Sequence, residues 1–134
     1  MSYEESLRSI SLNADASLAV YTGVPSAPGS PTPNYGMQYR FVKVTGARQC
    51  GLVTAAADQA VGVMQNKPQV TGQAATVAIH GVTNVMSGGA ITAGATVTSD
   101  ATGRATPSAS NVRGIALAAA GGANELVPVL LQVS

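Results

Sequence analysis

The chain has 134 residues, with seven Lys and Arg against six Asp and Glu and a net charge of +1. Charged residues make up only 10% of it, against about 25% in an average globular protein, and they form no basic face of the kind that binds nucleic acid. No apolar run approaches the ~20 residues that span a bilayer, and Met1–Leu12 lacks the apolar core of a secretory signal. We therefore expect no nucleic acid and no membrane among its partners.

Residues 1–36 are predicted to form an extended N-terminal arm with a Pro-rich segment. Ser2-Tyr3-Glu4-Glu5 matches a capping box, which predicts a short helical turn, and Ser17–Tyr21 predicts a short strand. Residues 23–36 hold four of the seven prolines, which lack a backbone donor, so a linker or surface loop is expected there. We expect the rest of the chain to fold without this arm.

Residues 37–134 read as the folded body, a single all-β domain. The segment is rich in Val, Thr and Gly, which disfavour helix, and its apolar runs are short and separated by turn residues such as those of Asp100–Gly103. Regular short strands of this kind predict a small β-barrel or sandwich. The expected strands are 38–45, 61–66, 75–80, 82–86, 95–99, 104–106, 113–118 and 126–133.

Two segments of the body share a pattern of strand, turn and strand. Each has a glycine near the start of its first strand, Gly62 in one segment and Gly114 in the other. Glycine inside a strand marks a bulge or a close approach of two backbones. We expect the two hairpins, within 61–79 and 113–130, to pair as pseudo-symmetric halves of one small barrel.

The sequence holds no recognisable catalytic or metal-binding pattern. The single cysteine and the single histidine exclude an internal disulfide framework and a multi-histidine metal site. The acids of the body, Asp58, Asp100 and Glu125, lie near predicted turns, which favours solvated turn residues over a catalytic carboxylate pair. We expect no enzyme activity, no metal and no cofactor.

Several polar positions keep two interpretations open. Cys50 is interpreted as a small buried hydrophobe, with a thiolate favoured by a nearby cation as the alternative. His80 ends an apolar strand, which favours a structural or surface role over a role in an interface or ligand site. The cations Arg8, Arg40, Lys43 and Arg48 are interpreted as scattered solvated charges, with a basic strip facing a partner as the alternative.

Residues 60–131 resemble the capsid cement, or head decoration, family of tailed phages. The resemblance rests on Ala60-Val61-Gly62-Val63, on the segments 72–78 and 88–105, and on the closing pair Arg113-Gly114-Ile115-Ala116-Leu117 and Leu126-Val127-Pro128-Val129-Leu130-Leu131. Its most specific part is Ile91–Ala105. The resemblance implies a small β-barrel or β-tulip-like domain that binds the outer surface of a phage capsid as a homotrimer and stabilises the lattice of the major capsid protein.

The resemblance also implies a location and a set of contacts. The protein would be made in the host cytoplasm and reside in the virion, with the major capsid protein and further copies of itself as partners. Family members often touch the capsid through extended N-terminal segments, so capsid or trimer contacts are expected at Leu7, Ile10, Leu12, Leu18, Val20, Tyr21, Pro25, Pro28, Tyr35 and Arg40. The alternative is a surface-displayed β-domain that binds host glycans or other ligands, which the 4% content of aromatic residues disfavours.

Overall fold

The computed structural model describes residues 8–18, 37–68 and 70–132, and these residues form strands and no helix. Their β-branched and small side chains suit the pleated backbone of a sheet. The expected all-β barrel fold is confirmed. The strands are β1 (Arg8–Ala14), β2 (Phe41–Gly46), β3 (Gln49–Leu52), β4 (Ala60–Met64), β5 (Ala74–Gly88), β6 (Thr96–Ser99), β7 (Ala105–Pro107), β8 (Gly114–Ala116) and β9 (Ala123–Leu131).

The observed strands differ from the expected ones at a few places. The expected strands 75–80 and 82–86 are one continuous strand, β5, because Gly81 has a φ of 104° and bends the strand without ending it. The sequence does not predict β1 and β3. Of the expected strand Ser17–Tyr21, the first two residues lie in a turn and the others lie outside the described residues.

The first half of the chain forms a closed five-stranded barrel. The strands follow the order β1, β3, β2, β4 and β5, and the first half of β5 pairs back with β1 to close the ring. β1 and β3 run parallel, and the other neighbours run antiparallel. The buried side chains of this barrel are Ala14, Leu18, Val42, Cys50, Met64, Ala75 and Val77.

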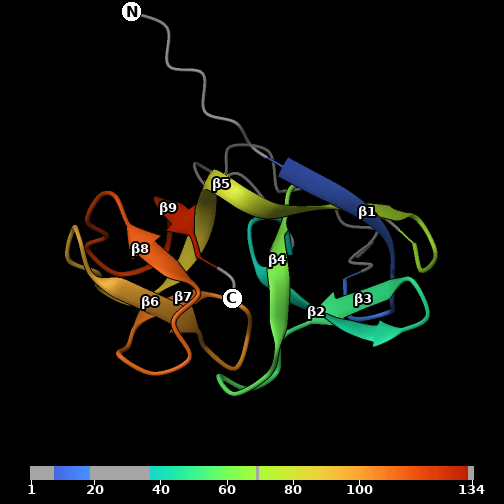
Figure 1. Cartoon of the computed structure of the whole chain (residues 1–134), viewed down its shortest axis with the longest axis horizontal. Coiled ribbons are helices and arrows are strands. Elements are labelled where there is room, and N and C mark those ends of the chain that lie inside the picture. The colour runs from blue at the N-terminus through green and yellow to red at the C-terminus, as the bar shows by residue number, and fades with distance from the viewer. Residues whose placement is uncertain (1–7, 19–36, 69, 133–134) are drawn as a thin grey trace, which may run out of the picture.

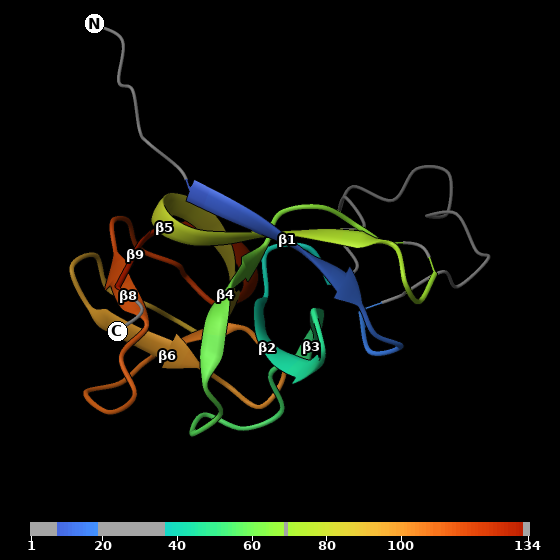
Figure 2. The same ribbon diagram turned by 45° about the vertical axis from the view of Figure 1, so that its right-hand side comes forward.

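The second half of the chain repeats this connectivity. The second half of β5 pairs with β9, followed by β8, β6 and β7, and the ring closes through the parallel pair Ser87 and Ala105. β5 therefore belongs to both barrels, with β1 to β3 on one side of the molecule and β6 to β9 on the other (Figure 1). In the turned view, β1 lies along the first half of β5 (Figure 2).

Equivalent residues of the two barrels make the same backbone hydrogen bonds. The amide of Tyr39 donates to the carbonyl of Met64 at 2.7 Å, and the amide of Gly94 donates to the carbonyl of Ala116 at 2.8 Å. Positive φ angles also recur at equivalent places, which shows that the two halves share backbone geometry as well as strand order. The equivalent residues with positive φ are Tyr39 and Gly94, Arg48 and Gly103, and Gly72 and Asn124.

The two similar hairpins of the sequence belong to different barrels. One is β4 with the first half of β5, and the other is β8 with β9. The expectation that they are halves of one barrel is therefore wrong, because each hairpin closes a ring with three strands of its own. The expected close approach is confirmed: a Cβ on Gly62 would collide with the carbonyl oxygen of Ala78, and one on Gly114 would lie 2.6 Å from that of Leu130.

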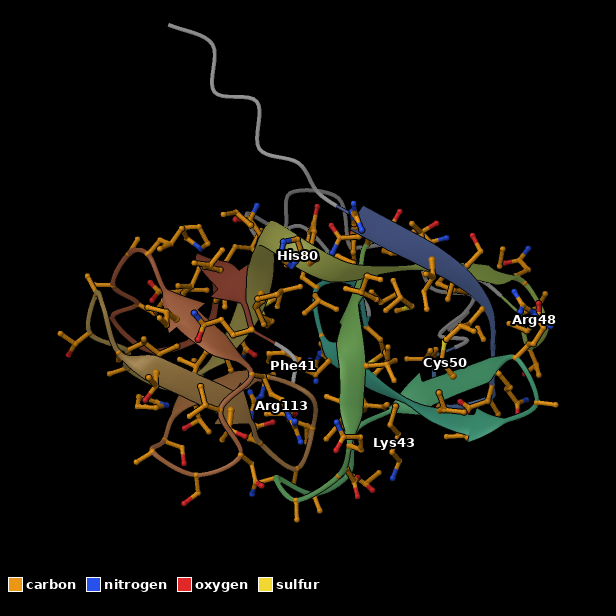
Figure 3. All side chains as sticks on the ribbon, in the orientation of Figure 1. Phe41, Lys43, Arg48, Cys50, His80 and Arg113 are labelled. Carbon is orange, nitrogen blue, oxygen red and sulfur yellow. The ribbon has the colours of Figure 1, made fainter. Side chains whose placement is uncertain are left out.

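The wall of β2, β4 and β5 is buried on both of its faces. Neighbouring residues along each strand alternate between the interior of the first barrel and a second cluster that extends into the other barrel. Phe41, the largest fully buried side chain, lies between the two barrels (Figure 3). The residues of the wall that belong to the shared cluster are Phe41, Ala60, Val63 and Ala78.

β1 belongs to the first barrel, although the sequence assigns it to an arm. It pairs with β5 over most of its length and with β3 at its end, and Leu18 packs in the same barrel. Removal of residues 1–36 would take β1 and Leu18 out of this barrel, and the expectation that the body folds without them stays a prediction. Residues 1–7 and 19–36, with the expected helical turn and Pro-rich segment, lie outside the described residues, and a domain division after residue 36 stays a prediction.

Replacement of Gly114 by Ala is expected to lower the free energy of unfolding by about 1–3 kcal/mol, because the new methyl group must displace backbone atoms of β9. Gly62→Ala should behave in the same way. Gly89→Ala is the control, since its Cβ would meet nothing within 4 Å. Urea unfolding of the three variants measures the difference, and wild-type stability in Gly114→Ala would contradict the close approach.

Candidate functional site

The titratable side chains of the described residues do not gather at one place. No three His, Cys, Asp or Glu side chains in this part of the chain lie close enough to hold a metal ion. His80 is exposed on β5, whereas Cys50 is buried in the first barrel (Figure 3). The described segments include no helix that is long and apolar enough to cross a membrane.

Asp100 holds the hairpin turn between β6 and β7. Its carboxylate accepts hydrogen bonds from the backbone amides of Thr102 at 2.8 Å and Arg104 at 2.9 Å, and it pairs with Nε of Arg104 at 3.2 Å. Burial raises the pKa of Asp100, but the hydrogen bonds from Arg104 and Thr102 outweigh burial and bring the pKa below its ordinary value. The predicted turn role of this acid is confirmed.

Asp58 holds the loop between β3 and β4. Its Oδ2 accepts from Nζ of Lys43 at 2.8 Å and from the backbone amides of Thr54 and Ala55 at 3.0 and 3.1 Å. The hydrogen bond from Lys43, followed by that from Thr54, holds the pKa of Asp58 far below its ordinary value of 3.8. Lys43 is thereby engaged, and it lies apart from Arg48 (Figure 3), which favours scattered charges over a basic strip.

The thiol of Cys50 is an inert part of the first barrel. Its side chain is fully buried, and burial raises the pKa of Cys50 to about 11. A thiol with such a pKa carries almost no thiolate at neutral pH. The interpretation of Cys50 as a small buried hydrophobe is confirmed.

Four of the ten expected contact residues lie in the described part of the chain. Ile10 is 40% exposed and Leu12 is half-buried, both on β1. Arg40 lies at the junction of the barrels, where its Nη1 donates to the carbonyl of Thr102 at 2.9 Å. Leu18 is corrected: it is 1% exposed within the first barrel and has no surface to offer a partner. The other six, which lie outside the described residues, are Leu7, Val20, Tyr21, Pro25, Pro28 and Tyr35.

A group of apolar side chains that the sequence does not predict lies on the outer side of β8 and β9. Along β9 the buried Val127, Val129 and Leu131 alternate with three half-buried apolar residues that face outward. The outward residue Leu130 pairs with Ile115 of β8 on one side and with Val82 of β5 on the other. We call the outward set the apolar face; its members are Val82, Ile115, Leu117, Leu126, Pro128 and Leu130.

The apolar face has the composition of an interaction surface. The solvated side of an antiparallel strand is ordinarily polar, and grouped apolar side chains on a surface mark a place that another molecule covers. The signal in the sequence is the unbroken apolar run Leu126–Leu131, which is typical of a strand that is buried on both sides. Leu117, just after β8, is 49% exposed and is the most open member.

The apolar face is suited to contact with another protein, and the described residues offer no cluster of metal ligands beside it. The model of the phage cement protein family matches residues 37–131, and the chain therefore belongs to the phage cement proteins. The match confirms the resemblance and extends it from residue 60 back to residue 37, so that β2 and β3 are included. As a member of this family, the chain is a capsid-associated structural protein of a phage.

The chain also shares its fold with a solved structure. The structure described as the head fiber gp8.5 N base of bacteriophage phi29 is similar to this chain with a TM-score of 0.61 and 19% sequence identity, over 96% of this chain and 97% of that one. At this identity, the similarity shows a shared fold. It includes nearly the whole chain, whereas the family match starts after β1. No curated protein matches the chain.

Asp58→Asn is expected to lower stability at pH 7, and the deficit should shrink as the pH falls. The folded-state pKa of Asp58 is lowered, so its stabilising effect is present above the unfolded pKa near 3.8 and is lost as the pH falls below that value. Urea unfolding of both proteins at neutral pH and at a series of acidic pH values measures the deficit. A deficit that stays constant down to acidic pH would contradict the ion pair with Lys43.

Cys50 is expected to react with a thiol reagent about a hundredfold or more slowly in the native protein than in urea, because it is buried and its pKa is raised. The absorbance of released thionitrobenzoate follows the reaction. Equal rates in the two states would show that the first barrel is open around this side chain.

Proposed function

We propose that this protein binds the outer surface of a phage capsid as a homotrimer and cements the lattice of the major capsid protein. The observation that carries the proposal is the family match, which includes eight of the nine strands of the two-barrel body. The apolar face supports it, because that surface is suited to contact with another protein.

A cement protein needs a rigid body rather than a reactive site. The two barrels share β5, and their junction adds hydrogen bonds between the backbones: Phe41 donates to Gly103 at 2.7 Å, and Met86 donates to Tyr39 at 2.8 Å. Side chains join the same junction, since Nη2 of the buried Arg113 donates to the carbonyl of Asp58 at 2.9 Å. A body held in this way transmits load between capsid subunits without bending.

We assign the capsid contacts to residues 1–7 and 19–36. The second of these segments is anchored at both ends, by the buried Leu18 and by Met37, which packs against the first barrel. Its four prolines limit the backbone conformations open to it, which lowers the entropic cost of binding a partner. Three copies of such a segment on one trimer bind more tightly than one, because the second and third contacts form at high effective concentration. The proposed contacts here are Leu7, Val20, Tyr21, Pro25, Pro28 and Tyr35.

The test is co-sedimentation of purified protein with expanded capsids that lack it. One variant lacks residues 1–7, and a second replaces residues 22–35 by a Gly-Ser linker of equal length; both retain β1 and Leu18, which the first barrel needs. We expect a loss of capsid affinity of roughly tenfold or more in the second variant. The controls are circular dichroism and thermal unfolding, which should match the wild type.

Two results would count against the proposal in different ways. If both variants bind as well as the wild type, the assignment of the contacts to these segments is wrong. If the wild-type protein does not bind capsids, the proposed function itself is wrong.

A further inference from the structure

The internal repeat relates a buried surface of the first barrel to a surface of the second barrel that is partly open among the described residues. The hydrogen bonds between equivalent strands fix the correspondence: the amide of Gln65 donates to the carbonyl of Thr76 at 2.7 Å, as that of Leu117 does to Pro128 at 2.8 Å. Registers then match Val63 with Ile115 and Ala78 with Leu130. In the first barrel this outer surface packs against the second barrel, whereas in the second barrel it is the apolar face.

The surface of the second barrel that packs against the wall also has an equivalent in the first barrel, and there it is partly open. In the second barrel, the wall of the first barrel covers Thr83, Val85 and Ser99. These side chains are 5%, 0% and 1% exposed. The strand pairings identify the equivalent residues of the first barrel. The pairing of β1 with β5 corresponds to that of β5 with β9, and the pairing of β2 with β3 corresponds to that of β6 with β7. We call these residues the rim; they are Ile10, Leu12 and Val44.

The rim is apolar and partly open. Ile10 is 40% exposed and Val44 is 56% exposed, although their partners across the sheet, Val77 and Cys50, are fully buried. Of the four large hydrophobic side chains that are exposed in the described part of the chain, three lie on these two surfaces: Ile10 and Val44 on the rim, and Leu117 on the apolar face.

One contact inside the molecule shows how the two surfaces fit. Nε2 of Gln65, on the outer side of the first barrel, donates to Oγ1 of Thr83 at 2.8 Å. The equivalent of Gln65 is Leu117, and the equivalent of Thr83 is Ile10. A polar pair that joins the two barrels is thus matched by an apolar pair, and both members of that apolar pair are exposed.

We propose that the apolar face of one copy of this chain covers the rim of the next copy and repeats between copies the contact that joins the two barrels within one. This contact is heterologous, and such contacts close into rings when the rotation between copies allows it. The inference rests on the proposed function in one respect: it specifies the contact between copies in the proposed homotrimer.

Two features of the surfaces favour a second copy as the occupant. The side chains that define the two surfaces are all apolar, so contact between these side chains itself buries no charge. The two barrels also differ in one backbone hydrogen bond. In the first barrel, the amide of Asn13 donates to the carbonyl of Arg48 of the same barrel at 2.8 Å. In the second barrel, the amide of the equivalent residue, Met86, donates to the carbonyl of Tyr39 in the first barrel. The contact between copies therefore uses side chains and leaves that backbone bond intact.

Sedimentation velocity tests the contact by measuring self-association at protein concentrations from about 1 µM to about 1 mM, a range that detects weak as well as moderate affinities. Leu117→Glu alters only the apolar face, and Ile10→Glu alters only the rim. Each should weaken self-association on the order of a hundredfold, because a carboxylate would be buried without a partner. Val70→Glu is the matched control, because Val70 is 53% exposed but lies on neither surface.

Mixing the two variants identifies the contact as heterologous. Each variant retains one intact surface, so an equimolar mixture of Leu117→Glu and Ile10→Glu should form heterodimers although each alone is monomeric. An isologous contact would not be restored in this way. Leu117→Ser, with the same expected loss in weaker form, replaces Leu117→Glu if the latter does not fold.

Three results would overturn the proposal: wild-type self-association in both variants, a mixture that stays monomeric, or a wild-type protein that is monomeric at every concentration. Capsid co-sedimentation separates this inference from the proposed function. If the wild type binds capsids and both variants self-associate as the wild type does, only the proposed contact is overturned. If the wild type self-associates but does not bind capsids, only the proposed function is overturned.

Discussion

The architecture depends on the pairing of one fifteen-residue strand, β5, with both barrels. Its first half closes the first ring through β1 and β4, and its second half closes the other ring through β9 and β7. Gly81, with its φ of 104°, turns the strand between the two rings at a position where a side chain would be strained. Because no linker separates the rings, the barrels have no hinge between them.

The two rings show which interactions the fold requires and which are free to differ. The close approach at Gly62 and Gly114 is the same in both, since backbone carbonyls fill the space where a side chain would stand. The outer side of the wall differs, with Gln65 and Ala78 in one barrel and Leu117 and Leu130 in the other. Closure of a ring thus constrains the backbone, whereas the outer surface follows what covers it.

The sequence predicts the properties that depend on local pattern. The all-β fold, most strands, the Asp100–Gly103 turn and the tight glycines all follow from residue types within a few positions of one another. β1 is not predicted because its polar and apolar residues look like an arm, and its partner β5 lies more than sixty residues away. β3 is short and contains Gly51, which weakens any strand pattern.

The number of barrels and the identity of the contact surface depend on pairings that no local pattern specifies. Two similar hairpins are compatible with one ring or with two, and the outcome is set by a strand that continues through Gly81. In the same way, the apolar run of β9 predicts a strand that is buried on both sides, but only the structure shows that one side stays partly open among the described residues. The expected contact Leu18 shows the opposite error, since an apolar residue near an arm packs in the core.

The small number of charges acquires a physical meaning from where they lie. Asp58, Asp100 and their partners Lys43 and Arg104 hold turns, and Arg113 is buried at the junction between the barrels. These five charges hold turns and the junction, and none of them belongs to the rim or the apolar face. Hydration of apolar surface is unfavourable, so the free energy of the system falls when other protein surfaces cover those regions. In the proposed function those regions are covered by partners, and the scarcity of surface charge would then favour binding.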